Sequence, residues 1–206
     1  MGTGMQAGIL ALLWLIYFVL HSWLASDRLK QRVAQLYPDL APGYRLAYNL
    51  FATVSVLVPL YLMWRWRGEL LIHWQGPWWY VSAAMTALAA VVLLLSMRHY
   101  DGGHFLGLRQ WRERRVSPEH GAQFVISPIH RFVRHPWYFA GLLLIWSRNM
   151  DLMMLVSALA LSLYLIIGSR IEEARLCRQF PDDYPRYRQR VAGLIPLPWK
   201  ILRNRR

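Results

Sequence analysis

The segment WYFAGLLLIWSRNMDLMMLVSALALSLYLIIG, residues 137–168, is the most informative part of this chain for its fold. It contains two apolar runs, Trp137–Trp146 and Leu152–Gly168, with the polar group Ser147–Asp151 between them. A helix needs about 20 apolar residues to cross a hydrocarbon layer of about 30 Å, and the second run approaches that length. The polar group predicts a tight turn, so the stretch predicts a hairpin of two antiparallel helices.

Three longer apolar runs precede this hairpin: Met5–Leu24, Leu46–Trp64 and Trp79–Met97. With the hairpin they predict an all-α, polytopic membrane protein of about five transmembrane helices. Trp137–Trp146 is too short to span the bilayer, which predicts that its start is sunk into the protein body as the floor of a pocket. Residues 1–206 are predicted to form a single integral membrane domain, in which residues 1–97 are a three-helix scaffold.

The composition excludes two other classes of protein. The chain is 56% hydrophobic with a formal charge of +13, and a soluble nucleic-acid binder would explain the charge but not the apolar content. A disulfide scaffold is excluded because Cys177 is the single cysteine. No nucleic-acid partner is expected, since no stacking platform or recognition helix accompanies the basic residues.

The distribution of basic residues predicts the orientation in the membrane. Of 24 Lys and Arg residues, 21 lie between the first and second helices, between the third and fourth, or after the fifth. The positive-inside rule then places the N-terminus outside and the C-terminus in the cytoplasm, with the active site on the same side. Membrane lipids are expected partners, because basic residues around Trp199 are typical of an interfacial anchor.

The run RHPWY, Arg134 to Tyr138, opens the first helix of the hairpin. Proline suits the first helical turn, where its missing N–H costs nothing, so His135 is predicted at the helix cap. Such a helix start offers unpaired N–H groups to an anion. The alternative is that Arg134 and His135 only mark the membrane interface.

Glu172 and Glu173 lie at the end of the second hairpin helix. Adjacent helical residues point about 100° apart, so at most one of them can face a given cleft, and the other is expected to face solvent or a basic neighbour such as Arg170 or Arg175. The alternative is a pair of surface salt bridges. Counting 1.5 Å per residue from a tight turn gives His135 and Glu172 an axial offset of about 10 Å, which predicts no direct contact but room for an extended ligand.

Beyond this helix, aromatic and apolar residues recur at spacings of three and four, which places them on one face of a short helix or pair of turns. Pro181 and Pro185 are expected to break that helix. The set could form a lid over the pocket or lie flat in the membrane interface. Its members are Leu176, Phe180, Tyr184, Tyr187, Val191 and Ile195.

The chain contains RHPWYFAG at residues 134–141 and, across the hairpin, EEARLCRQFPDDYPRYRQRV at residues 172–191, followed by Ile195 and Pro196. This combination resembles the isoprenylcysteine carboxyl methyltransferase and phospholipid methyltransferase superfamily of integral membrane methyltransferases. The pattern there is Arg-His-Pro-x-Tyr-x-x-Gly, then Glu-Glu-x-x-Leu, an aromatic residue and two tyrosines three residues apart. The matching positions here are Arg134, His135, Pro136, Tyr138, Gly141, Glu172, Glu173, Leu176, Phe180, Tyr184 and Tyr187.

Two further segments, GGHFLGLRQ (residues 102–110) and HSWLAS (residues 21–26), resemble the bacterial branch that includes methanethiol S-methyltransferases and NnrU-like proteins. This resemblance implies an S-adenosylmethionine-dependent methyltransferase and favours a small thiol over a prenylated protein as the lipophilic acceptor. It does not fix which acceptor is used.

The resemblance also implies where the cofactor binds: a cytoplasm-facing pocket formed within residues 98–206 by a loop, the hairpin and the tail. The implied cofactor contacts are Gln123, Phe124, Val125, His130, His135, Pro136, Trp137, Tyr138, Glu172 and Glu173. The sequence departs from the family at His130, where a Tyr is common, and at Pro181, where a Gly is usual. These two departures leave the contact at position 130 and the geometry of the lid open.

Residue chemistry is compatible with this interpretation. S-adenosylmethionine is extended and carries a sulfonium, which an aromatic face attracts by about 0.5–2 kcal/mol. A thiol acceptor reacts as the thiolate, and Arg134, His135 and Arg170 are the candidates for favouring it. No catalytic residue is assigned among them, and no metal is expected.

Two alternatives remain at this point. One is an NnrU-like haem or metal-binding membrane protein without methyltransferase activity, which would use imidazoles such as His21, His99, His104 or His135. In this reading His21 is notable because it lies inside an apolar helix, although such a residue more often hydrogen-bonds a neighbouring helix. The other is a structural membrane subunit. Neither the acceptor nor the oligomeric state follows from the sequence.

Overall fold

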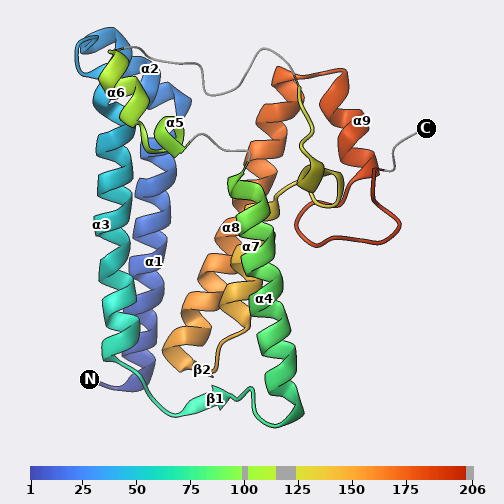
Figure 1. The fold of residues 1–206 in the computed structure, drawn as a ribbon. Coiled ribbons are helices and arrows are strands. Elements are labelled where there is room, and N and C mark those ends of the chain that lie inside the picture. The colour runs from blue at the N-terminus through green and yellow to red at the C-terminus, as the bar shows by residue number, and fades with distance from the viewer. Residues whose placement is uncertain (99–101, 115–123, 203–206) are drawn as a thin grey trace. The chain divides into compact units, whose positions relative to one another are not determined.

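A computed structural model describes residues 1–98, 102–114 and 124–202, and nearly all of its regular structure is helical (Figure 1). The elements in chain order are α1 (Thr3–Ala25), α2 (Asp27–Leu36), η1 (Ala41–Gly43), α3 (Tyr44–Arg65), β1 (Leu70–Ile72), α4 (Pro77–Met97), α5 (Gly102–Leu106), α6 (Leu108–Glu113), η2 (Pro128–Arg131), α7 (Pro136–Trp146), β2 (Met150–Asp151), α8 (Leu152–Gln179) and α9 (Asp183–Arg190).

Four of the helices in these ranges are long and apolar enough to cross a membrane: α1, α3 together with η1, α4 and α8. The helix α7 is apolar but has only 11 residues. These findings confirm the predicted all-α, polytopic fold class and indicate a multi-pass integral membrane protein.

The described chain forms two compact units. The first contains the described parts of residues 1–70, 100–120 and 151–160, and the second contains those of 71–99, 121–150 and 161–206. The single-domain organisation over residues 1–206 stays a prediction.

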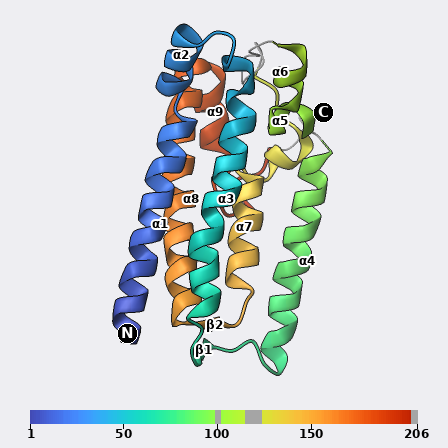
Figure 2. The same cartoon turned by 90° about the vertical axis from the view of Figure 1, so that its left-hand side faces the viewer.

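In the first unit, α1 and α3 lie side by side and run antiparallel (Figures 1 and 2). Polar side chains connect them inside an otherwise apolar interface. The Tyr44 hydroxyl donates to the Leu24 carbonyl at 2.6 Å, and the Tyr48 hydroxyl lies 2.8 Å from His21 Nε2. His21 therefore has the neighbouring-helix partner that a histidine in an apolar helix needs.

The short helices α5 and α6 attach to the start of α3 in the same unit. Arg45 Nη1 donates to the His104 carbonyl at 3.1 Å, and Asn49 Nδ2 donates to the Leu106 carbonyl at 3.0 Å. Gly107, which joins the two helices, has φ +85°, and a Cβ there would meet the Leu46 backbone nitrogen at 2.8 Å. This close approach requires glycine.

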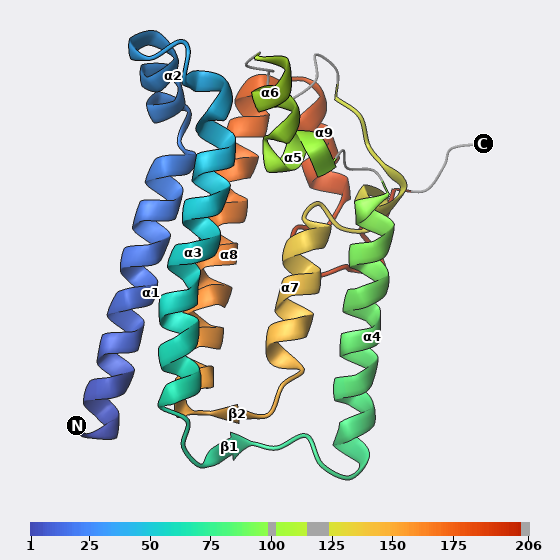
Figure 3. The same ribbon diagram turned by 60° about the vertical axis from the view of Figure 1, so that its left-hand side comes forward.

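In the second unit, α4 and α7 run antiparallel and side by side (Figure 3). Their shared core consists of Ala89, Val92 and Ala140, with Leu93, Phe139, Leu143 and Leu144 packed around them. Small residues at the centre let the two helices approach closely, as in other membrane helix pairs. Hydrogen bonds at the far end of α7 join Ser82 Oγ to the Ser147 carbonyl at 2.7 Å and Thr86 Oγ1 to Ser147 Oγ at 3.0 Å.

The connection between α7 and α8 differs from the predicted tight turn. It ends in the strand β2, which pairs with β1, and the Asp151 carboxylate accepts a hydrogen bond from the Met154 backbone at 2.8 Å. Aspartate is a preferred residue at a helix start for this reason. An extended residue spans about 3.3 Å, against 1.5 Å in a helix, so a connection of this kind covers more axial distance than a tight turn.

The helix α8 continues past the end of its apolar run at Gly168 and ends at Gln179. Pro181 lies in the turn that follows, as predicted. The prediction that Pro185 breaks a helix is wrong, because Pro185 lies in the first turn of α9, where an N–H is not needed.

Candidate functional site

The start of α7 lies in the second unit, and its geometry follows from the Arg-His-Pro sequence. His135 is the N-cap, with φ −122° and ψ 72°, outside the helical region, and Pro136 occupies the first helical position, which confirms both predictions. A residue before proline avoids the helical region, so the helix begins after His135. The backbone N–H groups of Arg134 and His135 donate to the carbonyls of Ala192 and Gly193 at 2.9 and 3.2 Å.

These two bonds place the tail segment, which we define as Val191–Gly193, beside the entry to α7. A parallel bridge between Val133 and Ala192 continues the pairing. The chain that follows α9 therefore returns to the beginning of α7.

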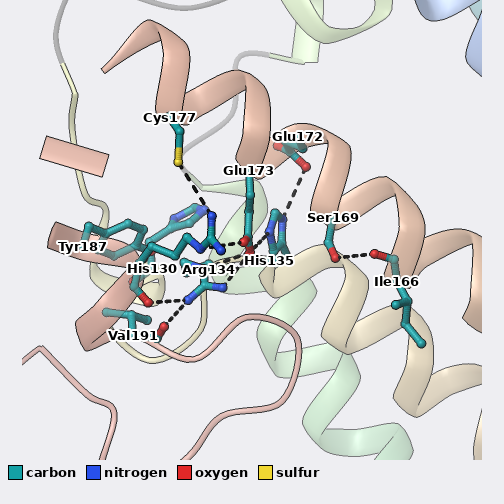
Figure 4. Close-up of polar contacts among 11 residues, drawn as sticks. His130, Arg134, His135, Ile166, Ser169, Glu172, Glu173, Cys177, Tyr187 and Val191 are labelled. Carbon is teal, nitrogen blue, oxygen red and sulfur yellow. Dashed lines mark hydrogen bonds and ion pairs between the residues drawn. The ribbon is translucent and has the colours of Figure 1, made fainter. Parts of the chain in front are cut away.

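The Glu173 carboxylate is the buried centre of an ionic cluster (Figure 4). Its side chain is 5% exposed. Its Oε1 accepts from Arg134 Nε at 3.0 Å, from Arg134 Nη2 at 2.7 Å and from His135 Nε2 at 3.1 Å. Its Oε2 lies 3.5 Å from Arg188 Nε. We call these four residues, Arg134, His135, Glu173 and Arg188, the Glu173 cluster.

Glu172 lies at the edge of this cluster. Its side chain is 43% exposed, and its Oε2 lies 3.3 Å from His135 Nδ1. The two adjacent glutamates thus face different surroundings, as the helical geometry predicts, and Glu173 is the buried one.

The predicted absence of contact between His135 and Glu172 is wrong. The count of axial rise assumed a tight turn and parallel helix axes, whereas the connection contains extended residues. A bridging ligand is therefore not needed to explain why these residues share a site.

His135 has a carboxylate at each ring nitrogen. Burial alone would lower its pKa, but the hydrogen bonds and charges of Glu172 and Glu173 outweigh this effect, and the pKa of His135 is raised above its ordinary 6.5. With both ring N–H groups donating, the imidazolium is the favoured form. The Tyr138 ring stacks on it, with centroids 5.2 Å apart and planes 9° from parallel.

The aromatic residues after α8 form a compact core and do not lie flat on a surface. Tyr184, Tyr187 and Val191 are buried, and Phe124, Leu176, Cys177, Phe180 and Leu202 pack against them. Ile195, which was predicted to share their face, is 64% exposed and lies outside this core. Its separation follows from the end of α9 at Arg190, beyond which the helical spacing no longer applies.

The two tyrosine hydroxyls of this core differ in their partners. The Tyr187 hydroxyl donates to the His130 carbonyl at 2.7 Å. The Tyr184 hydroxyl is buried and has no hydrogen-bond partner within the described part of the chain. Burial raises the pKa of both phenols, so each is a neutral donor at physiological pH.

The remaining residues that were predicted to contact the cofactor differ in burial and in their partners. Phe124 is in the aromatic core, whereas Val125 is 78% exposed. His130 Nδ1 lies 2.7 Å from Ser127 Oγ, and Pro136 is buried at the start of α7. The list is completed by Trp137 and Tyr138, which lie in the first turn of α7 and are half-buried, and by Gln123, which is outside the described residues.

Of the three residues predicted to favour a thiolate, Arg134 and His135 belong to the Glu173 cluster, and Arg170 is exposed on α8 outside it. Sequence reasoning missed Arg188 and Gly193. Arg188 is one of several arginines in α9, and nothing in the sequence distinguishes it from Arg186 or Arg190. Gly193 had a detectable signal, because a glycine after a helix often marks a close approach of the backbone.

Comparison with known proteins finds relatives along most of the chain. It is 31% identical over 193 residues to methanethiol S-methyltransferase 1 of Bradyrhizobium diazoefficiens, a match that covers 90% of this chain and 65% of that protein. It is 29% identical over 194 residues to the methanethiol S-methyltransferase of Pseudomonas deceptionensis, covering 90% and 71%. For the enzyme of that name from Mycobacterium tuberculosis, the identity is 28% over 191 residues, covering 89% and 75%.

The chain thus spans 65% to 75% of the length of these relatives. No family profile matches it, and no solved structure does. The similarities nevertheless confirm the resemblance predicted from the sequence. The chain is a homologue of proteins named methanethiol S-methyltransferase, consistent with the isoprenylcysteine carboxyl methyltransferase-like family of membrane methyltransferases.

Proposed function

We propose that this protein is a membrane-embedded, S-adenosylmethionine-dependent methyltransferase that transfers a methyl group to a small thiol such as methanethiol. The observation that carries the proposal is the similarity to proteins of that name over about 90% of the chain. The ionic and aromatic groups around the start of α7 supply a site whose chemistry suits the reaction.

The described residues fit the cofactor in two respects. Glu172 presents a half-exposed carboxylate that can accept from the ammonium or the ribose hydroxyls of the cofactor. The Tyr184 hydroxyl is a buried donor without a protein partner among the described residues, and such a group is costly unless a ligand satisfies it.

We assign the cofactor contacts accordingly. Glu172 and Tyr184 provide the polar contacts, and Phe124, Trp137 and Tyr138 contribute aromatic surface. Glu173 supports the site from behind, because its Oε1 already accepts three hydrogen bonds.

The bound cofactor supplies an electrophilic methyl group, and the protein supplies alignment and exclusion of water. Arg134 and His135 are both held in their protonated, cationic forms by neighbouring carboxylates, Glu173 for both and Glu172 for His135, so neither acts as a base toward a thiol. The acceptor therefore enters as a thiolate, and the rate of methylation should rise with pH as the free thiol ionises.

We further propose that the site faces the cytoplasm, with the N-terminus outside. The support is the distribution of Lys and Arg, 21 of which fall on one side of the predicted spans and three, Arg65, Arg67 and Arg148, on the other. The haem or metal alternative gains no support. His21 bonds Tyr48, His104 Nδ1 lies 3.5 Å from Arg45, and His135 lies between two carboxylates, while His99 falls outside the described residues.

The test is product analysis. Membranes containing the full chain are incubated with methyl-labelled S-adenosylmethionine and, separately, methanethiol, longer alkanethiols and phosphatidylethanolamine. The proposal expects labelled dimethyl sulfide from methanethiol and no labelled phospholipid. Labelled phospholipid without any thioether would instead assign a lipid acceptor, and no labelled product at all would remove the proposed activity.

A further inference from the structure

The attachment of the tail segment to the start of α7 depends on one side chain. All three side-chain nitrogens of Arg134 donate to residues that lie 39 to 57 positions further along the chain. Its Nε and Nη2 donate to Glu173 on α8, and its Nη1 donates to the Arg188 carbonyl on α9 at 2.8 Å and to the Val191 carbonyl in the tail segment. A single guanidinium therefore contacts three successive parts of the chain.

The acceptors on α9 and the tail segment suit a cation. The last carbonyl groups of a helix have no partner within the helix and carry the negative end of its dipole. α9 ends at Arg190, so the Arg188 and Val191 carbonyls lie at this end. Arg134 satisfies both of them, and its side chain is only 11% exposed.

Glu173 completes the arrangement from the opposite side. Its buried carboxylate balances the buried guanidinium and is engaged at both oxygens, so it is not free to hold a ligand. Gly193 allows the close approach, because a Cβ at this position would meet Arg134 Nη2 at 3.1 Å.

We propose that Arg134 and Glu173 are positioning residues that fasten the tail segment Val191–Gly193 and the end of α9 to the start of α7, and that this attachment holds Tyr184 in its buried place. The two glutamates then have different roles: Glu173 holds the tail, and Glu172, at the edge of the cluster beside His135, is the one that the proposed function assigns to the cofactor. The link to ligand binding rests on the proposed function, whereas the attachment of the tail does not.

The chain contains its own reporter of this attachment. Cys177 is the single cysteine, it is half-buried, and it packs against the core of Tyr184, Tyr187 and Val191. Arg188 Nη1 lies 3.9 Å from its sulfur. Displacement of α9 would therefore uncover the thiol.

The experiment measures the rate at which a maleimide labels Cys177 in the full chain, purified in detergent. We expect Arg134→Gln to raise the rate at least about tenfold, since loss of a buried ionic partner shifts local opening by more than tenfold. Arg134→Lys, which keeps the charge but loses the planar fork, should give an intermediate rate. Gly193→Ala should also raise the labelling rate, because its Cβ would crowd Arg134 Nη2 and displace the tail segment, while every charged group is kept.

Two variants serve as matched controls. Arg186→Gln changes an exposed arginine on the same helix, and Glu172→Gln changes the adjacent glutamate; both should label at the wild-type rate. Thermal unfolding of each variant shows whether it is folded when labelled. The proposal is overturned if folded Arg134→Gln labels at the wild-type rate, or if Glu172→Gln accelerates labelling as much as Arg134→Gln does.

A parallel titration with S-adenosylmethionine separates this inference from the proposed function. If the cofactor binds the wild type, it should slow labelling there, and Arg134→Gln should weaken binding. If the wild type shows no saturable cofactor binding while Arg134→Gln still labels faster, the proposed function fails and the positioning role stands.

Discussion

Replacing Glu173 by glutamine should destabilise the protein much more than the same change at Glu172. In Glu173→Gln, the Arg134 guanidinium and the His135 imidazolium lose a counter-charge that is 5% exposed, in a cluster where Arg134 itself is 11% exposed. Removing one partner of a buried ion pair costs about 3–5 kcal/mol. Arg134 keeps its two carbonyl acceptors, so we expect the lower end, about 3 kcal/mol.

Thermal unfolding in detergent measures this difference. For a chain of this size, about 3 kcal/mol corresponds to a fall in Tm of about 6–12 °C. Glu172 is 43% exposed, and an exposed ion pair contributes about 0–1 kcal/mol, so Glu172→Gln should lower Tm by no more than about 4 °C. Equal shifts for the two variants, or a larger shift for Glu172→Gln, would refute the assignment of Glu173 as the buried anchor.

Three further predictions concern separate parts of the molecule. The pKa of His135 is raised, so its stabilising charge is fully present below about pH 6.5 and is lost as the pH rises through the folded-state pKa. The Tm of the wild type should therefore fall as the pH is raised, and His135→Gln should lack that fall. Tyr184→Phe removes a buried hydroxyl without a partner in the described ranges; it should leave Tm unchanged or raised and weaken S-adenosylmethionine binding about threefold to tenfold in equilibrium dialysis. In the wild type, the buried Trp14 indole N–H donates to Ser157 Oγ at 2.9 Å, and Ser157→Ala removes this acceptor. Calorimetry should show that the free energy of unfolding falls by about 1–3 kcal/mol, with cofactor binding unchanged.

The helices that cross the membrane were predictable because apolar length is a property of the local sequence. The start of α7 was predictable for a similar reason, since Pro136 restricts both itself and His135. The relation to membrane methyltransferases also follows from residues that can be read in order along the chain.

The arrangement of the site was harder to predict. Counting residues gave His135 and Glu172 an offset because it could not foresee an extended connection after α7, and adjacent glutamates cannot be distinguished without knowing which face of α8 is covered. The helices α5 and α6 depend on tertiary hydrogen bonds from Arg45 and Asn49 rather than on their own periodicity. Arg188 was missed because its role depends on where α9 folds back.

The proposal that the groups around the start of α7 hold the methyl donor is tested most directly by equilibrium binding of labelled S-adenosylmethionine to the purified full chain. We expect saturable binding by the wild type and by Arg186→Gln, and binding about tenfold weaker by Glu172→Gln, because that variant loses a charge-assisted hydrogen bond. Absence of saturable binding by the wild type, or unchanged affinity in a folded Glu172→Gln variant, would contradict it.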